Sequence, residues 1–258
     1  RQMCIRDRLY SVDCQVEFFP LNGKKGFVLE EDFLQALTKE IDIIFLCNPN
    51  NPTGLLVEKP LLEKILKRCQ ELDILMAVDE CFLDFVPSPE KYTLKEYLET
   101  YDNLFLLKAF TKRYAMAGVR LGYGLCGNKG LLEKIEGVCQ PWNVSSMAQA
   151  AGLAALQERE YVEKGRQVTF QELAYLKEEL TALGYPVYPS QANYVFFTGP
   201  ADLYEKLEQK KILIRDCSNY TGLSKGYYRV AVKKHEENQQ LVRALKEIDR
   251  TKVENVIL

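Results

Sequence analysis

Short apolar runs alternate with amphipathic segments along the first half of this 258-residue chain. The runs at residues 43–47, 75–78 and 104–107 are bounded by polar or turn-forming residues, which is typical of buried strands. Apolar residues at helical spacing predict helices at 29–40 and 59–72. Strands that alternate with helices predict a mostly parallel sheet with right-handed crossovers.

The second half of the chain has a different pattern. After a further predicted strand at 121–126, a helical pattern runs from Met147 to about residue 183 and would bridge to a second domain. Beyond it we predict strands at 186–189, 194–197, 213–216 and 228–232, and helices at 201–209 and 236–248. The chain is therefore predicted to contain a large α/β domain over residues 9–160 and a smaller α+β domain over residues 161–258.

Composition excludes several functional classes. The chain is 47% hydrophobic and 27% charged, with a net charge of −2, as in a globular protein. No basic stripe with interleaved aromatic residues supports nucleic-acid binding, and no apolar run reaches the ~20 residues that span a bilayer. Eight scattered cysteines without a Cys-x-x-Cys pair predict reduced thiols in a cytoplasmic protein. The single histidine, His235, is predicted to be exposed, so no metal site is expected.

The segment around Lys112 carries the first chemical signal. Arg120 follows Lys112 by eight residues, with small residues and Gly118 between them. A lysine amine can form an imine with an aldehyde, and the arginine fork can clamp phosphate oxygens. Taken alone, this spacing does not exclude two surface charges in a loop. Lys108 is a poorer candidate, because the residue eight positions after it is Met116, whose thioether cannot hold a phosphate.

Two further polar motifs come directly after predicted strands. Asn51 lies in the sequence Asn-Pro-Asn-Asn-Pro-Thr-Gly at residues 48–54, and Asp79 ends the strand at 75–78. Ligands of open α/β sheets bind outside the carboxyl ends of the strands, so both motifs are expected beside one site. An aspartate there can keep a pyridine nitrogen protonated, which makes the ring an electron sink.

In this order, the three motifs resemble the class I/II aminotransferase family of fold-type-I pyridoxal 5'-phosphate (PLP) enzymes. The resemblance implies an α/β fold with a mostly parallel sheet in the large domain and a smaller C-terminal α+β domain. It also implies roles for single residues. Asn51 would hydrogen-bond the phenolic oxygen of PLP, Asp79 would pair with its ring nitrogen, and Lys112 would bind it covalently. Arg120 would hold its phosphate, with the Thr111 hydroxyl nearby.

Phe82 distinguishes between branches of this family. Many aminotransferases have at this position a tyrosine that donates a hydrogen bond to PLP, and phenylalanine cannot do so. The pattern around Phe82, and segments at 141–145, 191–194, 212–220 and 228–232, look like the threonine-phosphate decarboxylase branch, which is related to histidinol-phosphate aminotransferase. This branch implies that Arg229 binds the α-carboxylate of the substrate and that Arg215 anchors a substrate phosphate. Asn143 and Asn193 are the other expected substrate contacts. A surface salt bridge is the alternative interpretation for each arginine.

The favoured function is therefore PLP-dependent decarboxylation of L-threonine O-3-phosphate to aminopropanol phosphate, a lyase reaction of cobalamin biosynthesis. Two alternatives remain open: amino transfer, as in histidinol-phosphate aminotransferase, and a non-catalytic sensor domain built on the same fold. Family members are typically homodimers, so a homodimer is expected.

The start of the chain departs from the family pattern. Residues 1–8 have no periodicity and resemble translated sequencing adapter, so they are predicted to be non-native. The resemblance begins near Tyr10, and relatives have a glycine-rich phosphate-binding loop further upstream. The chain is therefore predicted to be truncated at its N-terminus. Ala109 is a second departure, because many relatives have at this position a serine or threonine that donates to the phosphate.

Overall fold

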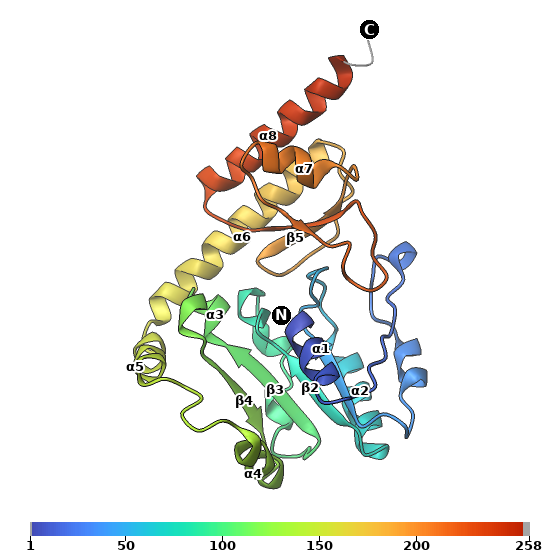
Figure 1. The fold of residues 1–258 in the computed structure, drawn as a ribbon, viewed down its shortest axis with the longest axis vertical. Coiled ribbons are helices and arrows are strands. Elements are labelled where there is room, and N and C mark those ends of the chain that lie inside the picture. The colour runs from blue at the N-terminus through green and yellow to red at the C-terminus, as the bar shows by residue number, and fades with distance from the viewer. Residues whose placement is uncertain (1, 255–258) are drawn as a thin grey trace.

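The computed structural model of the protein describes residues 2–254. Two units lie one above the other in Figure 1. The large unit contains a four-stranded sheet with strand order β1-β2-β3-β4, and the small unit contains a three-stranded sheet with order β5-β7-β6. Helix α6 follows the large unit in the sequence and extends beside both units (Figure 1). It therefore connects them through the backbone.

The large sheet is mostly parallel, as the alternation of strands and helices predicts. Its strands are β1 (Ile43–Cys47), β2 (Leu75–Asp79), β3 (Leu104–Ala109) and β4 (Gly122–Cys126). The pairs β1–β2 and β2–β3 are parallel, whereas β4 runs antiparallel to β3. The helices of this unit are α1 (Gln2–Tyr10), α2 (Lys59–Glu71), α3 (Phe110–Arg113), α4 (Lys129–Val138) and α5 (Ser146–Ala155).

Helix α2 shows how the sequence builds the core of the large unit. A proline in its first turn is compatible with helix initiation. Leu62, Ile65, Leu66 and Cys69 then lie on one face, each at most 1% exposed, and pack against the strands. After the helix, Asp73 adopts a left-handed conformation with φ of 60°, which turns the chain directly into β2.

The parallel pairing brings three strand ends to one edge of the large sheet. Cys47 and Asp79 are paired in register, and the Asn48 amide donates to the Asp79 carbonyl at 3.0 Å. The Glu80 amide donates to the Leu107 carbonyl of β3, also at 3.0 Å. The loop after β1, the end of β2 and the helix after β3 therefore lie side by side.

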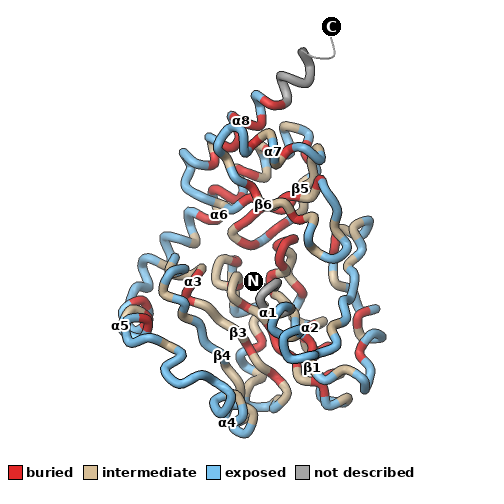
Figure 2. The backbone as a smooth tube through the Cα atoms, in the orientation of Figure 1, coloured by how far each residue is buried: buried red, intermediate tan, exposed pale blue. Residues whose placement is uncertain are grey.

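The small unit is built around an antiparallel sheet. Its strands are β5 (Tyr194–Thr198), β6 (Arg215–Asp216) and β7 (Tyr227–Ala231), and its helices are α6 (Arg159–Ala182), α7 (Leu203–Gln209) and α8 (His235–Glu254). One face of the sheet packs against the helices through a fully apolar cluster. Figure 2 shows this buried layer between the strands and the helices.

The two faces of the small sheet differ because strand residues alternate between them. Val195, Phe197 and Tyr228 point into the core formed with the helices. Phe196 and its register partner Arg229 therefore lie on the opposite face. Phe196 packs there against Phe27, which comes from the N-terminal part of the large unit.

The loop at 48–54 is attached to the small unit. Gly54 has a φ of 73°, and a Cβ on it would lie 1.8 Å from the Ser190 hydroxyl oxygen. Only glycine allows this approach. The Gln191 amide donates to the Gly54 carbonyl at 2.8 Å, and the Tyr194 hydroxyl donates to the Asn50 carbonyl at 2.8 Å. The units are thus joined by backbone contacts beside the strand ends.

Several predicted elements differ from the structure. The predicted helix at 29–40 is wrong, because the chain forms only a short 3-10 helix, Glu31–Ala36, before Leu37 becomes extended. The predicted strand at 186–189 is reduced to one bridge between Val187 and Phe197, since its terminal prolines cannot donate to a ladder. The predicted strand at 213–216 shortens to β6.

Three further differences concern helices. The helix predicted from Met147 to about residue 183 is interrupted between α5 and α6. Helix α4 was not predicted. Asn128 caps its N-terminus, because the Asn128 side chain accepts from the Leu131 amide. Residues 2–10 form α1, although no element was predicted there. The predicted boundary between residues 160 and 161 falls within α6 and stays a prediction. The other 3-10 helices are Gly23–Lys25, Leu83–Phe85, Pro89–Lys91, Lys95–Tyr97 and Ala117–Val119.

The described part of the chain carries no helix that is both long and apolar enough to cross a membrane. Within the same residues, no three histidine, cysteine or acidic side chains are grouped so as to hold a metal ion. His235 is exposed, as predicted, with its side chain 50% accessible and its Nδ1 atom 3.0 Å from the Glu172 carboxylate.

A buried ion pair fixes β2 against β3. Glu80 is fully buried, and its carboxylate lies 2.7 Å from the Lys108 amine, whose side chain is only 14% exposed. The Thr93 hydroxyl and the Leu94 amide also donate to this carboxylate. Because a buried carboxylate needs its partners, removal of one partner is strongly destabilising.

We predict that Glu80→Ala lowers the free energy of unfolding by about 3 kcal/mol, because it leaves the Lys108 charge without its buried partner. Urea unfolding followed by circular dichroism measures the loss. Glu96→Ala is the control, since the Glu96–Lys59 pair is exposed on the Glu96 side and should contribute less than about 1 kcal/mol. Equal losses for the two variants would contradict a structural role for the buried pair.

Candidate functional site

Asp79 stands at the carboxyl end of β2 with its side chain partly buried. One carboxylate oxygen accepts from the Cys81 amide at 2.9 Å, and the Cys47 sulfur lies 4.0 Å from the other. These contacts hold the carboxylate at the strand end. An anionic group in this position suits a cationic ring nitrogen, as the sequence predicts.

Lys112 lies in the single turn of α3 that follows β3. Its amine is 5.2 Å from the centre of the Phe82 ring, and the Phe82 ring meets the Tyr194 ring edge-on at 5.1 Å. Thr111 beside it is buried. The lysine therefore extends from the large unit toward an aromatic surface that both units supply.

Asn51 is the point where the large unit meets the arginines of the small unit. Its side chain is buried, and its amide oxygen accepts from the Arg229 guanidinium and from the Tyr220 hydroxyl, the latter at 3.3 Å. Arg229 also lies over the Tyr194 ring at 4.9 Å. Asn51, Arg229 and the aromatic residues thus form one contiguous group.

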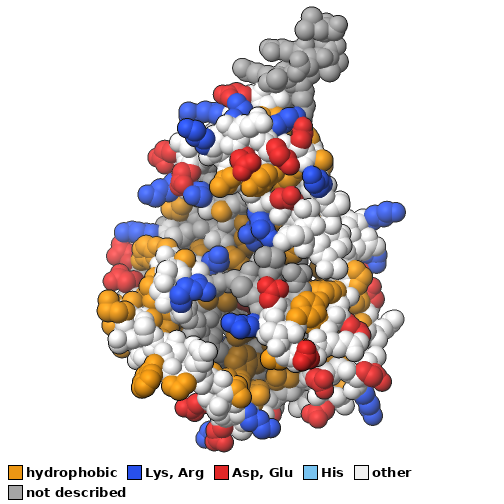
Figure 3. Space-filling model, in the orientation of Figure 1, with side chains coloured by type: hydrophobic (Ala, Val, Ile, Leu, Met, Phe, Trp, Pro, Cys, Tyr) orange, Lys and Arg blue, Asp and Glu red, His pale blue; other side chains and the backbone are white. Residues whose placement is uncertain are grey.

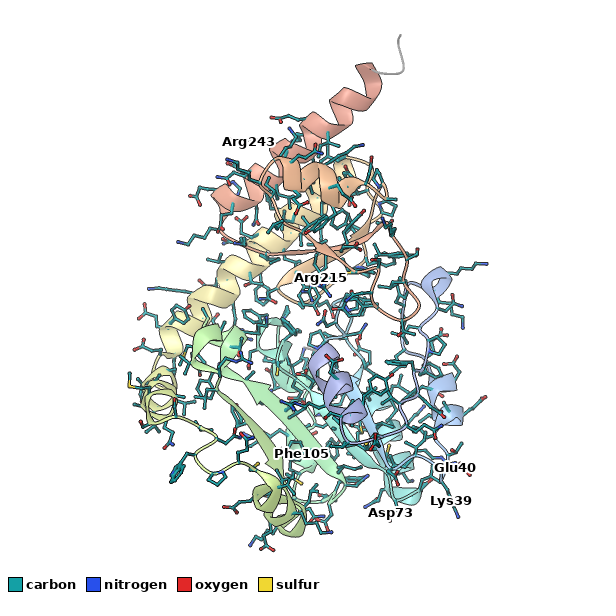
Figure 4. All side chains as sticks on the ribbon, in the orientation of Figure 1. Lys39, Glu40, Asp73, Phe105, Arg215 and Arg243 are labelled. Atoms are coloured by element: carbon teal, nitrogen blue, oxygen red, sulfur yellow. The ribbon has the colours of Figure 1, made fainter. Side chains whose placement is uncertain are left out.

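Arg215 and Arg229 are register partners in the antiparallel pair β6–β7 and so lie on the same face of the small sheet. The Arg215 guanidinium donates to the Asn219 side chain at 3.0 Å and lies 5.8 Å from the Tyr220 ring centre. Figure 4 places Arg215 at the edge of the small unit that is nearest the large unit. Two guanidinium groups beside each other, facing one site, suit a substrate with two anionic groups.

Two buried side chains of this region, Tyr194 and Cys217, stay uncharged. Figure 3 shows basic side chains, with acidic ones among them, on the face where the two units meet. Burial raises the pKa of Tyr194 well above its ordinary value, although the nearby Arg229 opposes this effect, so the phenol stays protonated and donates to Asn50. Burial also raises the pKa of the Cys217 thiol to about 11, so this thiol stays neutral beside the arginines.

Three of the residues predicted to bind cofactor or substrate lie outside this group of contacting side chains. Arg120 is exposed, has a φ of 59°, and donates to the Ala117 carbonyl of its own turn at 3.1 Å. Asn143 is exposed in the loop between α4 and α5 and makes no hydrogen bond to the other site residues. Asn193 precedes β5, and its buried side-chain oxygen has no hydrogen-bond partner among the described residues. The roles predicted for these three residues stay predictions.

The structure adds residues that the sequence motifs did not single out. Tyr220 and Tyr194 contact Asn51 and Arg229, yet each is one of many tyrosines in the sequence. Both lie in segments that resemble the threonine-phosphate decarboxylase branch, 191–194 and 212–220, but the sequence predicted no role for either tyrosine. The structure also explains why Lys108 is unsuited to a cofactor role, because its amine is paired with Glu80.

A small cavity of about 130 Å³ lies beside α3, lined in part by Lys108, Phe110, Arg113 and Tyr123. None of Asn51, Asp79 and the other predicted cofactor or substrate residues lines it. It is therefore separate from the group described above.

Comparison with known proteins agrees with this arrangement. Residues 9–245 match the model of the family described as aminotransferase class I and II. The chain is 36% identical to threonine-phosphate decarboxylase of Salmonella typhimurium, over 91% of this chain and 65% of that protein. It is 30% identical to histidinol-phosphate aminotransferase of Methanococcus aeolicus, over 96% of this chain and 66% of that protein. The chain thus spans about two thirds of the length of these relatives.

Solved structures extend the similarity to the fold. The crystal structure of histidinol-phosphate aminotransferase from Clostridium acetobutylicum matches with a TM-score of 0.90 and 28% identity, over 95% of this chain and 75% of that one. L-threonine-O-3-phosphate decarboxylase from Porphyromonas gingivalis matches with a TM-score of 0.80 and 25% identity, over 95% and 73%. The predicted fold-type-I architecture is confirmed, and this chain belongs to the class I and II aminotransferase family.

Proposed function

We propose that the complete protein is a PLP-dependent enzyme that decarboxylates L-threonine O-3-phosphate to aminopropanol phosphate. The observation that carries this proposal is the pair Arg215 and Arg229, two register-paired guanidinium groups on the face of the small sheet that meets Asn51. Such a pair suits a substrate with both a carboxylate and a phosphate. The similarity to the Salmonella decarboxylase supports the same substrate.

The residues present fit PLP by the chemistry of their donors. Lys112 supplies an amine for the aldehyde, Asp79 a carboxylate for the ring nitrogen, and Asn51 an amide for the phenolic oxygen. Thr111 and the exposed Arg120 are the groups available for the phosphate. When bound, PLP supplies an electron sink for a bond broken at the substrate Cα.

The protein side chains decide which bond breaks. Asp79 keeps a proton at the ring nitrogen, and Arg229 and Arg215 hold the two ends of the substrate. By fixing the two ends of the substrate, the arginines would decide which substituent of Cα is lost. Loss of the carboxylate would give decarboxylation. If the Cα hydrogen were presented instead, the Lys112 amine would take up that proton and amino transfer would follow.

Amino transfer is the second candidate function, and the high TM-score to the histidinol-phosphate aminotransferase from Clostridium acetobutylicum favours it. A phosphorylated substrate suits this reaction too, because its phosphate can bind Arg215. We further propose that the complete protein is a cytoplasmic homodimer, an assembly that light scattering after size-exclusion chromatography can test.

The decisive experiment uses the gene completed upstream of Tyr10. The purified protein with PLP is incubated with L-threonine O-3-phosphate, and CO2 release and amino transfer to 2-oxoglutarate are followed together. Stoichiometric CO2 is the expected result. Amino transfer without CO2 would replace decarboxylation by the second candidate, and the absence of both reactions would favour a non-catalytic sensor.

Lys112→Ala in the complete protein is expected to abolish the imine absorption band and to lower turnover at least about a hundredfold, because no other amine takes its place. Lys108→Ala is the control, and it should retain the band because the Lys108 amine is paired with Glu80. Borohydride reduction followed by peptide mass spectrometry identifies the modified lysine. A reducible band that persists in Lys112→Ala would contradict the assignment.

Arg215→Gln is expected to raise KM for L-threonine O-3-phosphate at least about tenfold, because a charge-assisted contact to the phosphate is lost. KM for unphosphorylated L-threonine should change little. Lys225→Gln removes an exposed cation from the neighbouring loop and serves as the matched control. If both variants raise KM equally, Arg215 acts only through the general positive field of the site.

A further inference from the structure

The orientation of the Asn51 side chain follows from its partners. A guanidinium group has only hydrogen-bond donors, so the Asn51 atom that faces Arg229 must be its oxygen. The Tyr220 hydroxyl meets the same oxygen at 3.3 Å, which is long for such a bond. With its oxygen turned to Arg229 and Tyr220, Asn51 presents its NH2 group in the other direction as a donor.

Tyr220 is held firmly enough to act on Asn51. Its ring packs against the apolar cluster of Phe27, Phe196 and Cys217, which joins the small sheet to the N-terminal part of the large unit. The backbone of its loop is fixed as well, because the Tyr220 amide donates to the Cys217 carbonyl at 3.0 Å. Burial raises the pKa of the phenol, so its hydroxyl remains a donor at neutral pH.

Arg229 and Tyr220, the two hydrogen-bond donors to Asn51, would behave differently when substrate binds. Arg229 is the residue proposed to bind the substrate carboxylate, and a guanidinium that turns to a new anion shares or releases its earlier contact. Tyr220 is not proposed to bind the substrate itself, although its hydroxyl also interacts with Arg215. Phe82, close to Lys112, has no hydroxyl and therefore cannot supply a hydrogen bond to the cofactor.

We propose that Tyr220 is a positioning residue that keeps Asn51 directed at the cofactor while Arg229 is occupied by substrate. This inference rests on the proposed PLP function. Tyr220 also lies against Arg215: the Arg215 guanidinium is 5.8 Å from the ring centre and interacts with the hydroxyl, which in turn donates to Asn51.

The test removes the hydroxyl and keeps the ring. In the complete protein, Tyr220→Phe is expected to weaken PLP binding, measured by fluorescence quenching, by about fivefold, the effect of one hydrogen bond. It should lower kcat by a similar factor and leave KM for L-threonine O-3-phosphate within about twofold, because the ring still lies against Arg215. Tyr227→Phe is the matched control, since Tyr227 stacks on Phe196 in the neighbouring strand and does not contact Asn51.

A double-mutant cycle separates positioning from a general structural effect. In an Asn51→Ala background, Tyr220→Phe should cause no further loss of PLP affinity, because the hydroxyl acts through the amide that is already absent. The same fivefold loss in both backgrounds would overturn the inference, as would an unchanged affinity in Tyr220→Phe alone. If the wild-type complete protein does not bind PLP, the proposed function falls and this inference falls with it.

Discussion

The parallel pairing of β1, β2 and β3 is the constraint on which the rest of the site depends. Parallel strands end at the same edge of a sheet, so the loop at 48–54, Asp79 and the turn that carries Lys112 are neighbours although 61 residues separate Asn51 from Lys112. The buried Glu80–Lys108 pair fixes two of these strand ends against each other. Asp79 and Lys112, the residues proposed to contact the ring nitrogen and the aldehyde of PLP, therefore come from strand ends that lie side by side.

The small unit supplies the two arginines that we propose bind the substrate. Alternation along β5 and β7 turns one face of its sheet into the helices and the other toward the large unit. Arg229 and Arg215 lie on this second face as register partners, together with Tyr194. In the proposed function, the residues assigned to the cofactor lie at the edge of one sheet and the arginines assigned to the substrate lie on the other. The hydrogen bond from the Gln191 amide to the Gly54 carbonyl helps to hold the two sheets together.

Helices and strands were predicted best where the spacing of apolar residues in the sequence was most regular. The apolar runs of β1 and β2 were predicted nearly to the residue, because each is continuous and bounded by polar or turn-forming residues. Helix α2 was equally clear from its spacing. The predicted helix at 29–40 failed, because the six-residue 3-10 helix Glu31–Ala36 and the extended Leu37 after it already bury the main apolar side chains, Phe33 and Leu37. The predicted strand at 186–189 is reduced to one bridge because its two prolines cannot donate hydrogen bonds to a ladder.

The sequence by itself determined the fold class, the order of the strand-end motifs and the chemical types that line the site. Those properties are local or depend on order along the chain. Only the tertiary structure decided that Arg229 and Tyr220 share the oxygen of Asn51, that Arg215 lies opposite Arg229, and that Lys108 is paired with Glu80. These contacts join segments distant in the sequence, and their geometry is set by strand register and by the packing of the two units, which no short stretch of residues encodes.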